Sequence, residues 1–432
     1  MSIFNRDDDD GISRGARAVL ALPDVAGNSK MRSVDARLDE AEGLAAAIGI
    51  SVVARKSWRV RSARPASLFG KGQAEEMAAL VESHHADLLV VDAALTPVQQ
   101  KTLEEMTKAK VIDRTGLILE IFGERAATAE GRLQVELAHL DYQAGRLVRS
   151  WTHLERQRGG FGFLGGPGET QIEADRRMIR NRMARIRREL KDVSRTRGLH
   201  RDRRQRAPWP VVALVGYTNA GKSTLFNRLT NASVMAEDLL FATLDPTMRE
   251  VRLPGHAKAI LSDTVGFVSD LPTELIAAFR ATLEEVTAAD LILHVRDIAH
   301  PDSEAQSADV KNVLASLGLE EGSGPRILEI WNKVDTLDEA DRVAVQGEAD
   351  RRDDVVTISA LTGEGIDQLR ELIATTLRGP GDIRRIKLAT GDGSRIAWLH
   401  AHGDVLDQNV DGDVMEMEVR LGGSDWDRFQ SL

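Results

Sequence analysis

Between residues 18 and 125, short apolar runs alternate with stretches in which apolar residues recur every three or four positions. The apolar runs predict strands at 18–22, 51–54, 87–92 and 110–113. The periodic stretches predict helices at 34–48, 73–84, 97–108 and 116–125. This alternation is typical of a parallel sheet covered by helices, so we predict a small parallel α/β domain over residues 18–127.

A heptad spacing follows and predicts two long helices. Apolar residues four and three positions apart form one series: Leu133, Leu137, Leu140, Ala144, Leu147, Trp151 and Leu154. A second series has related spacing: Ile172, Ile179, Met183, Ile186, Leu190 and Val193. A glycine-rich stretch at 159–168 lies between them, and the second helix opens with a capping box formed by Thr170 and Glu173. The two helices should therefore fold back as an antiparallel hairpin over residues 128–197, with the glycines at its tip.

The rest of the chain predicts two more domains. Residues 198–210 form a basic linker, and strand-like and helical stretches alternate again over residues 211–378. Gly379-Pro380-Gly381 then precedes a small domain at 379–432. The predicted fold class is multidomain α/β. It comprises a parallel N-terminal domain, a helical hairpin, a doubly wound central domain and a small C-terminal α/β domain.

The strand-like run Val211–Val215 leads into a loop with P-loop spacing, in which Gly-Lys-Ser follows a glycine after four residues. Glycines let backbone N–H groups wrap a phosphate chain, and the next helix adds its positive N-terminus. We expect Lys222 to reach the β- and γ-phosphates and the Ser223 hydroxyl to bind Mg²⁺. The predicted phosphate-binding residues are Gly216, Tyr217, Thr218, Asn219, Ala220, Gly221, Lys222 and Ser223.

Two later loops predict that the nucleotide carries guanine. Asn332, Lys333, Val334 and Asp335 follow a strand-like run, and the ionised carboxylate of Asp335 only accepts hydrogen bonds. Guanine offers two neighbouring donors to such a group, whereas adenine would place a lone pair against it. A second loop matches the backbone clamp that GTPases place on guanine O6; it contains Ser359, Ala360 and Leu361.

The central domain also contains candidates for both GTPase switches. Asp263, Thr264, Val265 and Gly266 match the Asp-x-x-Gly element of switch II. Asp263 would hold Mg²⁺ through water, and the Gly266 N–H would contact the γ-phosphate. Phe267 follows where many GTPases have a water-orienting glutamine, so we expect slow intrinsic hydrolysis.

Switch I is expected at residues 241–247. A threonine in this segment should complete the Mg²⁺ shell, and we choose Thr243 with Thr247 in reserve. The catalytic candidates are then Lys222, Thr243 and Gly266. The nucleotide-contacting residues expected here are Phe241, Ala242, Thr243, Leu244 and Asp245.

Charge is segregated along the 432 residues. The net charge is −10, yet residues 176–206 carry +11, which leaves −21 elsewhere. One dense basic segment in an acidic chain predicts a local polyanion contact. The expected phosphate contacts are Arg176, Arg177, Arg180, Arg182, Arg187 and Arg188. The alternative for these arginines is a solvated charged face.

The hairpin tip supplies apolar rings for a nucleic acid. Phe161 and Phe163 lie among glycines and would stack on unpaired bases. The alternative is that they fold back onto the hairpin.

Composition excludes several classes of protein. The chain has no cysteine, so it has neither disulfides nor thiolate metal sites. Residues 1–17 carry Asp7–Asp10 and read as a disordered acidic tail, not a signal peptide. No apolar run approaches the ~18 residues of a spanning helix. We expect a soluble, cytoplasmic monomer.

The motifs, in this order, resemble the translation-factor-related GTPases. The spellings at 216–223, 241–247 and 263–267 are similar to one family among them, the ribosome-associated HflX GTPases. Residues 160–177 are also similar to a signature of that family. The resemblance implies binding of GTP and GDP, binding to the large ribosomal subunit and its RNA, and splitting or rescue of stalled ribosomes. The rivals are a large-subunit assembly GTPase and an RNA-binding scaffold in which GTP is only a structural ligand.

Asn219 raises the question of a second cation. Related GTPases with asparagine at this P-loop position are stimulated by K⁺, which its side-chain carbonyl would help to coordinate against the phosphates. The alternative is that Asn219 only tolerates an unusual turn conformation.

Overall fold

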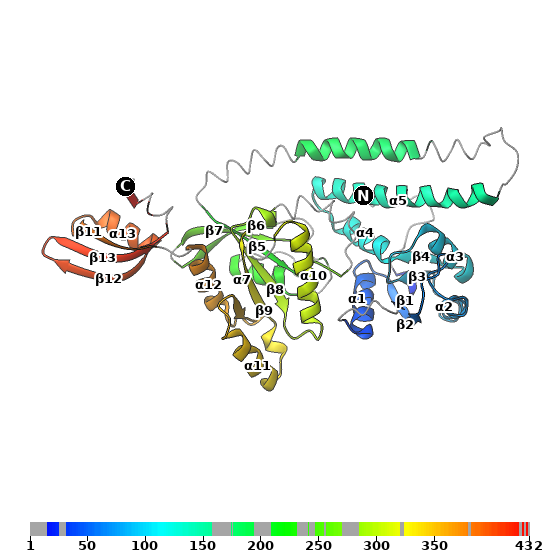
Figure 1. Cartoon of the computed structure of the whole chain (residues 1–432), viewed down its shortest axis with the longest axis horizontal. Helices are drawn as coiled ribbons and strands as arrows, with labels where there is room; N and C mark the ends of the chain where they lie inside the picture. The colour runs from blue at the N-terminus through cyan, green and yellow to red at the C-terminus, as the bar shows by residue number, and fades with distance from the viewer. Residues whose placement is uncertain are drawn as a thin grey trace.

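The computed structural model describes residues 15–25, 32–157, 174, 176–193, 209–230, 241, 247–254, 256–269, 285–319, 324–378, 382–422, 426 and 429–430. They form an N-terminal domain, a central domain and a C-terminal sheet, with long helices along one side (Figure 1).

The N-terminal domain is a parallel sheet with helices, as predicted. Its strands lie in the order β2-β1-β3-β4. Its elements are β1 (Arg17–Val25), α1 (Val34–Ala46), β2 (Ser51–Val60), α2 (Lys71–Ser83), β3 (Leu88–Val91), α3 (Pro97–Thr107), β4 (Lys110–Asp113) and α4 (Arg114–Arg125). Side chains cap the helix starts: the Ser33 hydroxyl accepts from the Ala36 N–H, and Asp113 accepts from the Gly116 N–H. All of β3 is buried, as expected of a strand covered on both faces.

The long helix α5 (Ala129–Gln157) packs against both α4 and α3. Val135 and Ala138 belong to the same core as α4, a contact face that the heptad pattern did not reveal. Helix 176–193 lies alongside α5 and buries Met183 and Ile186, two of the predicted seam residues (Figure 1). The tip of the predicted hairpin, including Phe161 and Phe163, lies outside the described residues.

The central domain has a six-stranded sheet in the order β10-β9-β8-β5-β7-β6. All neighbouring strands are parallel except the pair β6 and β7. Helices α7 and α12 share a core on one face, and α10 belongs to the core on the other. The elements are β5 (Val211–Gly216), α7 (Lys222–Thr230), β6 (Thr247–Leu253), β7 (His256–Asp263), β8 (Leu291–Asp297), α10 (Ser303–Ser316), β9 (Arg326–Asn332), α11 (Glu339–Ala349), β10 (Val355–Thr357) and α12 (Ile366–Arg378).

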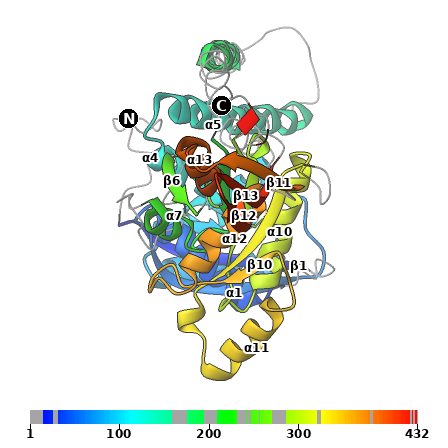
Figure 2. The same cartoon turned by 90° about the vertical axis from the view of Figure 1, so that its left-hand side faces the viewer.

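The C-terminal domain is a three-stranded antiparallel sheet in the order β11-β13-β12. It comprises β11 (Asp382–Ala389), α13 (Gly393–His402), β12 (Asp404–Asp411) and β13 (Val414–Leu421). Leu399 of α13 and Phe429 complete its small core. In both views, α5 and helix 176–193 lie on the side of the molecule opposite α11 (Figure 2).

The N-terminal and central domains share a hydrophobic core. The ring of Phe122 on α4 packs edge-on against Phe241, with ring centroids 4.6 Å apart. Phe267 and Val268, which follow the Asp-x-x-Gly segment, belong to the same cluster as Leu117 and Phe122. Phe241, the first residue of the predicted switch I segment, and the residues that follow the predicted switch II segment therefore both pack on the N-terminal domain.

A buried polar network joins the same two domains, and Glu40 of α1 is its centre. The Glu40 carboxylate accepts hydrogen bonds from the Tyr217 hydroxyl and, at 2.9 Å, from the Ser269 hydroxyl. It also pairs with Arg32 at 2.7 Å and with Arg114. Burial alone would raise the pKa of Glu40, but Arg114 and Arg32 lower it to about 2.

The network lies at the carboxyl ends of the N-terminal strands. Arg114 follows β4 and pairs with Asp92, which follows β3, and Arg32 lies between β1 and α1. Open parallel sheets usually bind their ligands in this crevice, where the strand order reverses. Here Tyr217 and Ser269 of the central domain fill it.

Replacing Glu40 tests how strongly the network holds. Glu40→Gln leaves the buried guanidinium groups of Arg32 and Arg114 without their shared carboxylate. Breaking a buried ion pair from one side typically destabilises by ~3–5 kcal/mol. We expect the urea concentration at the midpoint of unfolding to be clearly lower for this variant of the full chain. Unfolding is monitored by tryptophan fluorescence.

Glu42→Gln on the same helix is the matched control. Glu42 pairs with Arg55, and both side chains are 43% exposed, so its loss should cost less than ~1 kcal/mol. Equal midpoints for the two variants would contradict the central role of Glu40.

Candidate nucleotide-binding site

The predicted P-loop connects β5, in the middle of the central sheet, to the N-terminus of α7. Gly216 (φ +153°) passes so close to β8 that a Cβ atom there would lie 2.2 Å from the Val295 carbonyl oxygen. No other residue fits without moving the strand. Thr218 and Ala220 are buried in the turn. The loop is thus held in one position at the carboxyl end of the sheet, where such folds bind ligands.

Lys222 is buried beneath this loop. Its ammonium group donates to the Tyr217 carbonyl at 2.7 Å. Burial lowers the pKa of Lys222 to about 8, while Asp263 opposes the shift. A phosphate chain in the loop would restore the charge that burial disfavours, so the site is suited to an anion.

Ser223 and Asp263 supply oxygen ligands suited to Mg²⁺. The Ser223 hydroxyl donates to the Asp263 carboxylate at 2.9 Å, and Asp263 ends β7 fully buried. Hydroxyl and carboxylate oxygens are the ligands that Mg²⁺ prefers beside phosphates. Among the described residues, no group of three or more His, Cys, Asp or Glu side chains forms a metal site independent of a nucleotide.

The switch II segment lies against the P-loop. The Thr218 N–H donates to the Phe267 carbonyl at 2.7 Å, and the Phe267 N–H donates to the Gly216 carbonyl at 3.1 Å. A Cβ atom on Gly266 would lie 2.8 Å from the Thr218 methyl group and 3.1 Å from the Lys222 ammonium. Gly266 therefore lies beside the Lys222 ammonium, and its role as a γ-phosphate sensor stays a prediction. Thr264 donates to the Leu214 carbonyl, and Val265 is buried.

Only the ends of the predicted switch I segment are described. Phe241 is buried against Phe122 with φ +59°, and Thr247 begins β6 directly opposite Asp263. Ala242, Thr243, Leu244 and Asp245 lie outside the described residues. The choice between Thr243 and Thr247 as the Mg²⁺ ligand remains a prediction.

The two guanine loops meet through Asn332. Its side-chain amide donates to the Ala220 carbonyl at 2.8 Å, and its oxygen accepts from the Ala360 N–H at 2.9 Å. One buried residue thus joins the P-loop to the Ser-Ala-Leu loop. Ser359 is buried and accepts from the Thr362 N–H, while Leu361 is 72% exposed.

Asp335 lies half-buried just after β9 and is available to a base. Its carboxylate makes no hydrogen bond or ion pair with any residue in the described part of the chain. Lys333, at φ +69°, pairs with Asp297 at 2.7 Å, and Val334 is buried. The loop is braced around a free acceptor, as guanine recognition requires.

Arg228 is a contact that sequence reasoning missed. It lies on α7, and its guanidinium donates to the Ala360 carbonyl at 3.2 Å and to the Leu361 carbonyl. Helix α7, which follows the P-loop, therefore fixes the position of the Ser-Ala-Leu loop. Nothing local marks this role, because the partners are more than 130 positions apart.

Asn219 adopts φ +59° in the P-loop. Asparagine tolerates this left-handed conformation better than most residues, so the turn alternative fits the geometry. Coordination of a cation by Asn219 stays a prediction.

Family profiles match most of the chain. The profile described as GTP-binding GTPase N-terminal matches residues 35–123, and GTP-binding GTPase Middle Region matches residues 125–204. The profile described as 50S ribosome-binding GTPase matches residues 211–333, and HflX C-terminal domain matches residues 344–430.

Similar proteins cover nearly the whole chain. GTPase HflX of Magnetococcus marinus is 49% identical over 394 residues, which are 91% of this chain and 90% of that protein. GTPase HflX of Escherichia coli K12 is 42% identical over 396 residues, 91% of each chain. The crystal structure of a GTP-binding protein from Sulfolobus solfataricus with GDP has a TM-score of 0.44 at 21% identity, covering 84% of this chain and 98% of that one.

Asp335→Asn tests the base loop. The amide presents a donor where guanine also donates, so we expect loss of GTP binding and gain of xanthosine triphosphate. Sites built on hydrogen bonds reject mismatched analogues by roughly 10⁴-fold. Affinities are measured by titration with fluorescent analogues.

The control is Asp338→Asn, three positions along. Asp338 caps α11 by accepting from the Asp341 N–H, and asparagine caps equally well. An unchanged GTP affinity in Asp335→Asn would remove this loop from the site.

Arg228→Met tests the support of the Ser-Ala-Leu loop. Two charge-assisted hydrogen bonds are lost, so KM for GTP should rise by roughly tenfold. The turnover number should change little, because the phosphates are held elsewhere. Arg342→Gln, which removes an exposed pair with Glu364, should leave both constants unaltered. Equal falls in kcat and kcat/KM for Arg228→Met would contradict a role in base binding.

Proposed function

Because the chain belongs to the HflX family of GTPases, we propose that it binds the large ribosomal subunit in its GTP state and splits or rescues stalled ribosomes. GTP hydrolysis would then release it. The observation that supports this most directly is that the predicted P-loop, Asp-x-x-Gly segment and two base loops lie together in the central domain of a chain that also carries a basic helix. No helix among the described residues is long and apolar enough to span a membrane.

The basic helix 176–193 is the proposed RNA contact. Arg177, Arg180, Arg187 and Arg188 are exposed on it. Arg182 instead pairs with Glu136 of α5 through bonds of 2.5 and 2.7 Å, and Arg185 pairs with Glu189. The four exposed arginines are therefore the ones most able to contact phosphates.

In the proposed mechanism, this chain's residues position GTP and compensate its charge. Lys222 would contact the β- and γ-phosphates, and the Gly266 N–H would contact the γ-phosphate. Ser223, Asp263 and Thr243 would hold Mg²⁺, which neutralises developing charge on the phosphates. Phe267 is buried in the interdomain core, so it contributes no water-orienting group. Slow hydrolysis without the ribosome follows from that arrangement.

Three measurements test the proposal against its rivals. Sedimentation with large subunits should show binding with a non-hydrolysable GTP analogue and little with GDP. GTP turnover should rise with subunits, whereas a scaffold predicts no stimulation. Light scattering of intact ribosomes should fall on addition of the GTP-bound protein; an unchanged signal with normal subunit binding would favour the assembly role.

Replacing Arg177, Arg180, Arg187 and Arg188 with Gln tests the RNA contact. Each lost phosphate contact should reduce the log–log salt slope of subunit binding by about 0.7–0.9, and the four together by roughly 3. GTP binding to the free protein should not change. The slope is measured by sedimentation at several KCl concentrations.

A control quartet removes the same charge elsewhere. Arg326, Arg351, Arg385 and Lys387 are exposed on the central and C-terminal domains. Their replacement with Gln should leave the slope nearly unchanged. If both quartets reduce the salt slope equally, the reduction comes from the change in net charge and not from the loss of specific phosphate contacts.

Asn219 is proposed to coordinate a monovalent cation that helps hydrolysis. A cation supplied to the transition state of phosphoryl transfer can raise the rate of hydrolysis by roughly 10³-fold or more. K⁺ should then raise turnover over Na⁺ at equal ionic strength, and Asn219→Ala should abolish the difference while leaving GDP affinity nearly intact. Equal wild-type rates in K⁺ and Na⁺, with and without subunits, would falsify this.

A further inference from the structure

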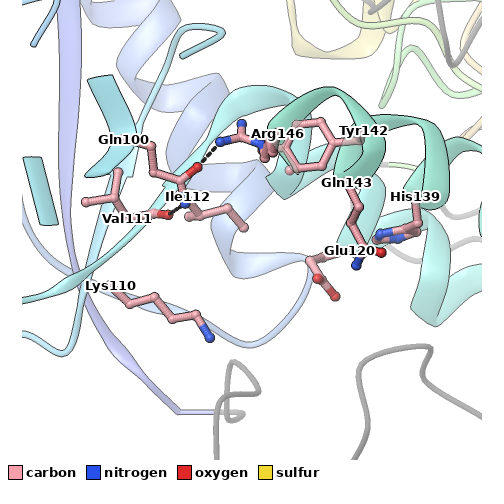
Figure 3. Close-up of a pocket in the computed structure, with 10 residues that line it drawn as sticks. Gln100, Lys110, Val111, Ile112, Glu120, His139, Tyr142, Gln143 and Arg146 are labelled. Carbon is pink, nitrogen blue, oxygen red and sulfur yellow. Dashed lines mark hydrogen bonds between the residues drawn. The ribbon is translucent and has the colours of Figure 1, made fainter. Parts of the chain in front are cut away.

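A cavity of about 210 Å³ opens beneath α5, apart from the GTPase site. It is bounded by β4, the edge strand of the N-terminal sheet, and by helices α3, α4 and α5 (Figure 3). One water needs about 10–15 Å³ by the same measure, so the space is far larger than a hydration site. It is smaller than the roughly 300 Å³ of the smallest drug-sized pockets. The cavity therefore fits one ring system, with any attached chain outside.

The walls of this α4–α5 pocket are held together by hydrogen bonds. Arg146 contacts Gln100 and, at 2.8 Å, Asp113, and its guanidinium lies 4.0 Å above the Tyr142 ring. The Tyr142 hydroxyl donates to Asp113 at 2.6 Å. Gln100 also donates to the Val111 carbonyl at 2.8 Å, which satisfies the open edge of β4. The pocket is thus preformed rather than a gap between loose side chains.

Two polar side chains in the lining retain hydrogen-bonding capacity. Neither the Glu120 carboxylate nor the Gln143 amide makes a hydrogen bond or ion pair with any residue the structure describes. Figure 3 shows Gln143 extending from α5 toward Glu120 on α4. A carboxylate accepts two donors side by side, and a neighbouring amide can donate to a carbonyl.

We propose that the α4–α5 pocket takes one unpaired guanine base of the RNA that the basic helix contacts. The guanine edge carries two neighbouring N–H donors for Glu120 and a carbonyl oxygen for the Gln143 amide. The mostly apolar walls suit a planar ring. Lys110, exposed at the lining, suits the phosphates that remain outside. The proposal rests on the proposed RNA binding, since the base must arrive on a strand held by helix 176–193.

Protonation of Glu120 gives the proposal a pH signature. Burial, and secondarily Glu124, raise the pKa of Glu120 to about 7, while Lys110 opposes the shift. Of the other groups facing it, burial lowers the pKa of His139 and raises that of Tyr142, so both favour their neutral forms near pH 7. The Arg146 guanidinium also lines the pocket. Guanine donors favour the ionised carboxylate, so affinity should rise from pH 6 to 8. Adenine would favour the protonated form and show the opposite trend.

The test uses the full chain with its GTPase site saturated by a non-hydrolysable GTP analogue and Mg²⁺, the state in which RNA binding is proposed. Short fluorescent oligouridine RNAs carry a central guanosine, inosine, adenosine or uridine, and binding is followed by anisotropy. Inosine lacks only the exocyclic amino group. We expect guanosine to bind roughly tenfold tighter than inosine, the discrimination typical of a bidentate contact. Equal affinities for guanosine and inosine, or tighter binding of adenosine than of guanosine at pH 8, would overturn the proposal.

Variants tie this preference to the pocket. Glu120→Gln should abolish both the guanosine preference and its pH dependence, and Gln143→Leu should weaken the preference. Glu124→Gln, on the exposed side of α4, should retain it. An undiminished preference in Glu120→Gln contradicts the assignment.

Two further arms separate the possible failures. If the all-uridine RNA does not bind at all, the RNA-binding function itself fails; if it binds but guanosine gives no gain, only the pocket proposal fails. Free guanosine is the last arm: displacement of the RNA by guanosine at equal affinity would make the occupant a small molecule and overturn the RNA assignment.

Discussion

The carboxylate of Glu40 is the group on which the arrangement of the two larger domains depends. It is buried where a charge is tolerated only if donors surround it, and two of its four donors belong to the central domain. Those two, Tyr217 and Ser269, flank the phosphate side of the nucleotide site. A buried ion cluster adds little net stability over an apolar interface, but it tolerates few alternative arrangements. The interface therefore specifies one docking geometry.

The nucleotide site is consequently divided in two. Its phosphate half, from Tyr217 to Gly266, rests on the N-terminal domain through the Glu40 network and the shared core. Its base half is held within the central domain by Asn332 and Arg228. The loops predicted to bind guanine are thus structurally independent of the N-terminal domain, whereas the groups predicted to sense the γ-phosphate are not.

Local patterns predicted the fold class, and the structure agrees. The parallel N-terminal sheet followed from alternating strands and helices, and the P-loop from its spacing. Contacts between distant residues could not be predicted. Tyr217 was assigned only to the loop, because its partner Glu40 lies 177 positions earlier. The heptad pattern gave one face of α5 and missed its contact with α4, since two overlapping apolar faces on one helix have no single period. Arg228 looked like an ordinary helix residue for the same reason.

The shared core has a consequence for how the chain is made. Its cluster includes residues from Ala18 to Ala138 and again from Ala213 to Leu319. Phe122 emerges from the ribosome well before Phe241, its partner, has been synthesised. At ~5–20 residues per second, the 181 residues from Ala138 to Leu319 take about 10–40 s to add. During that interval the growing N-terminal domain presents an apolar face that is covered only as the central residues, from Ala213 onward, are added. The order of synthesis therefore leaves part of the shared core exposed before the nucleotide site exists.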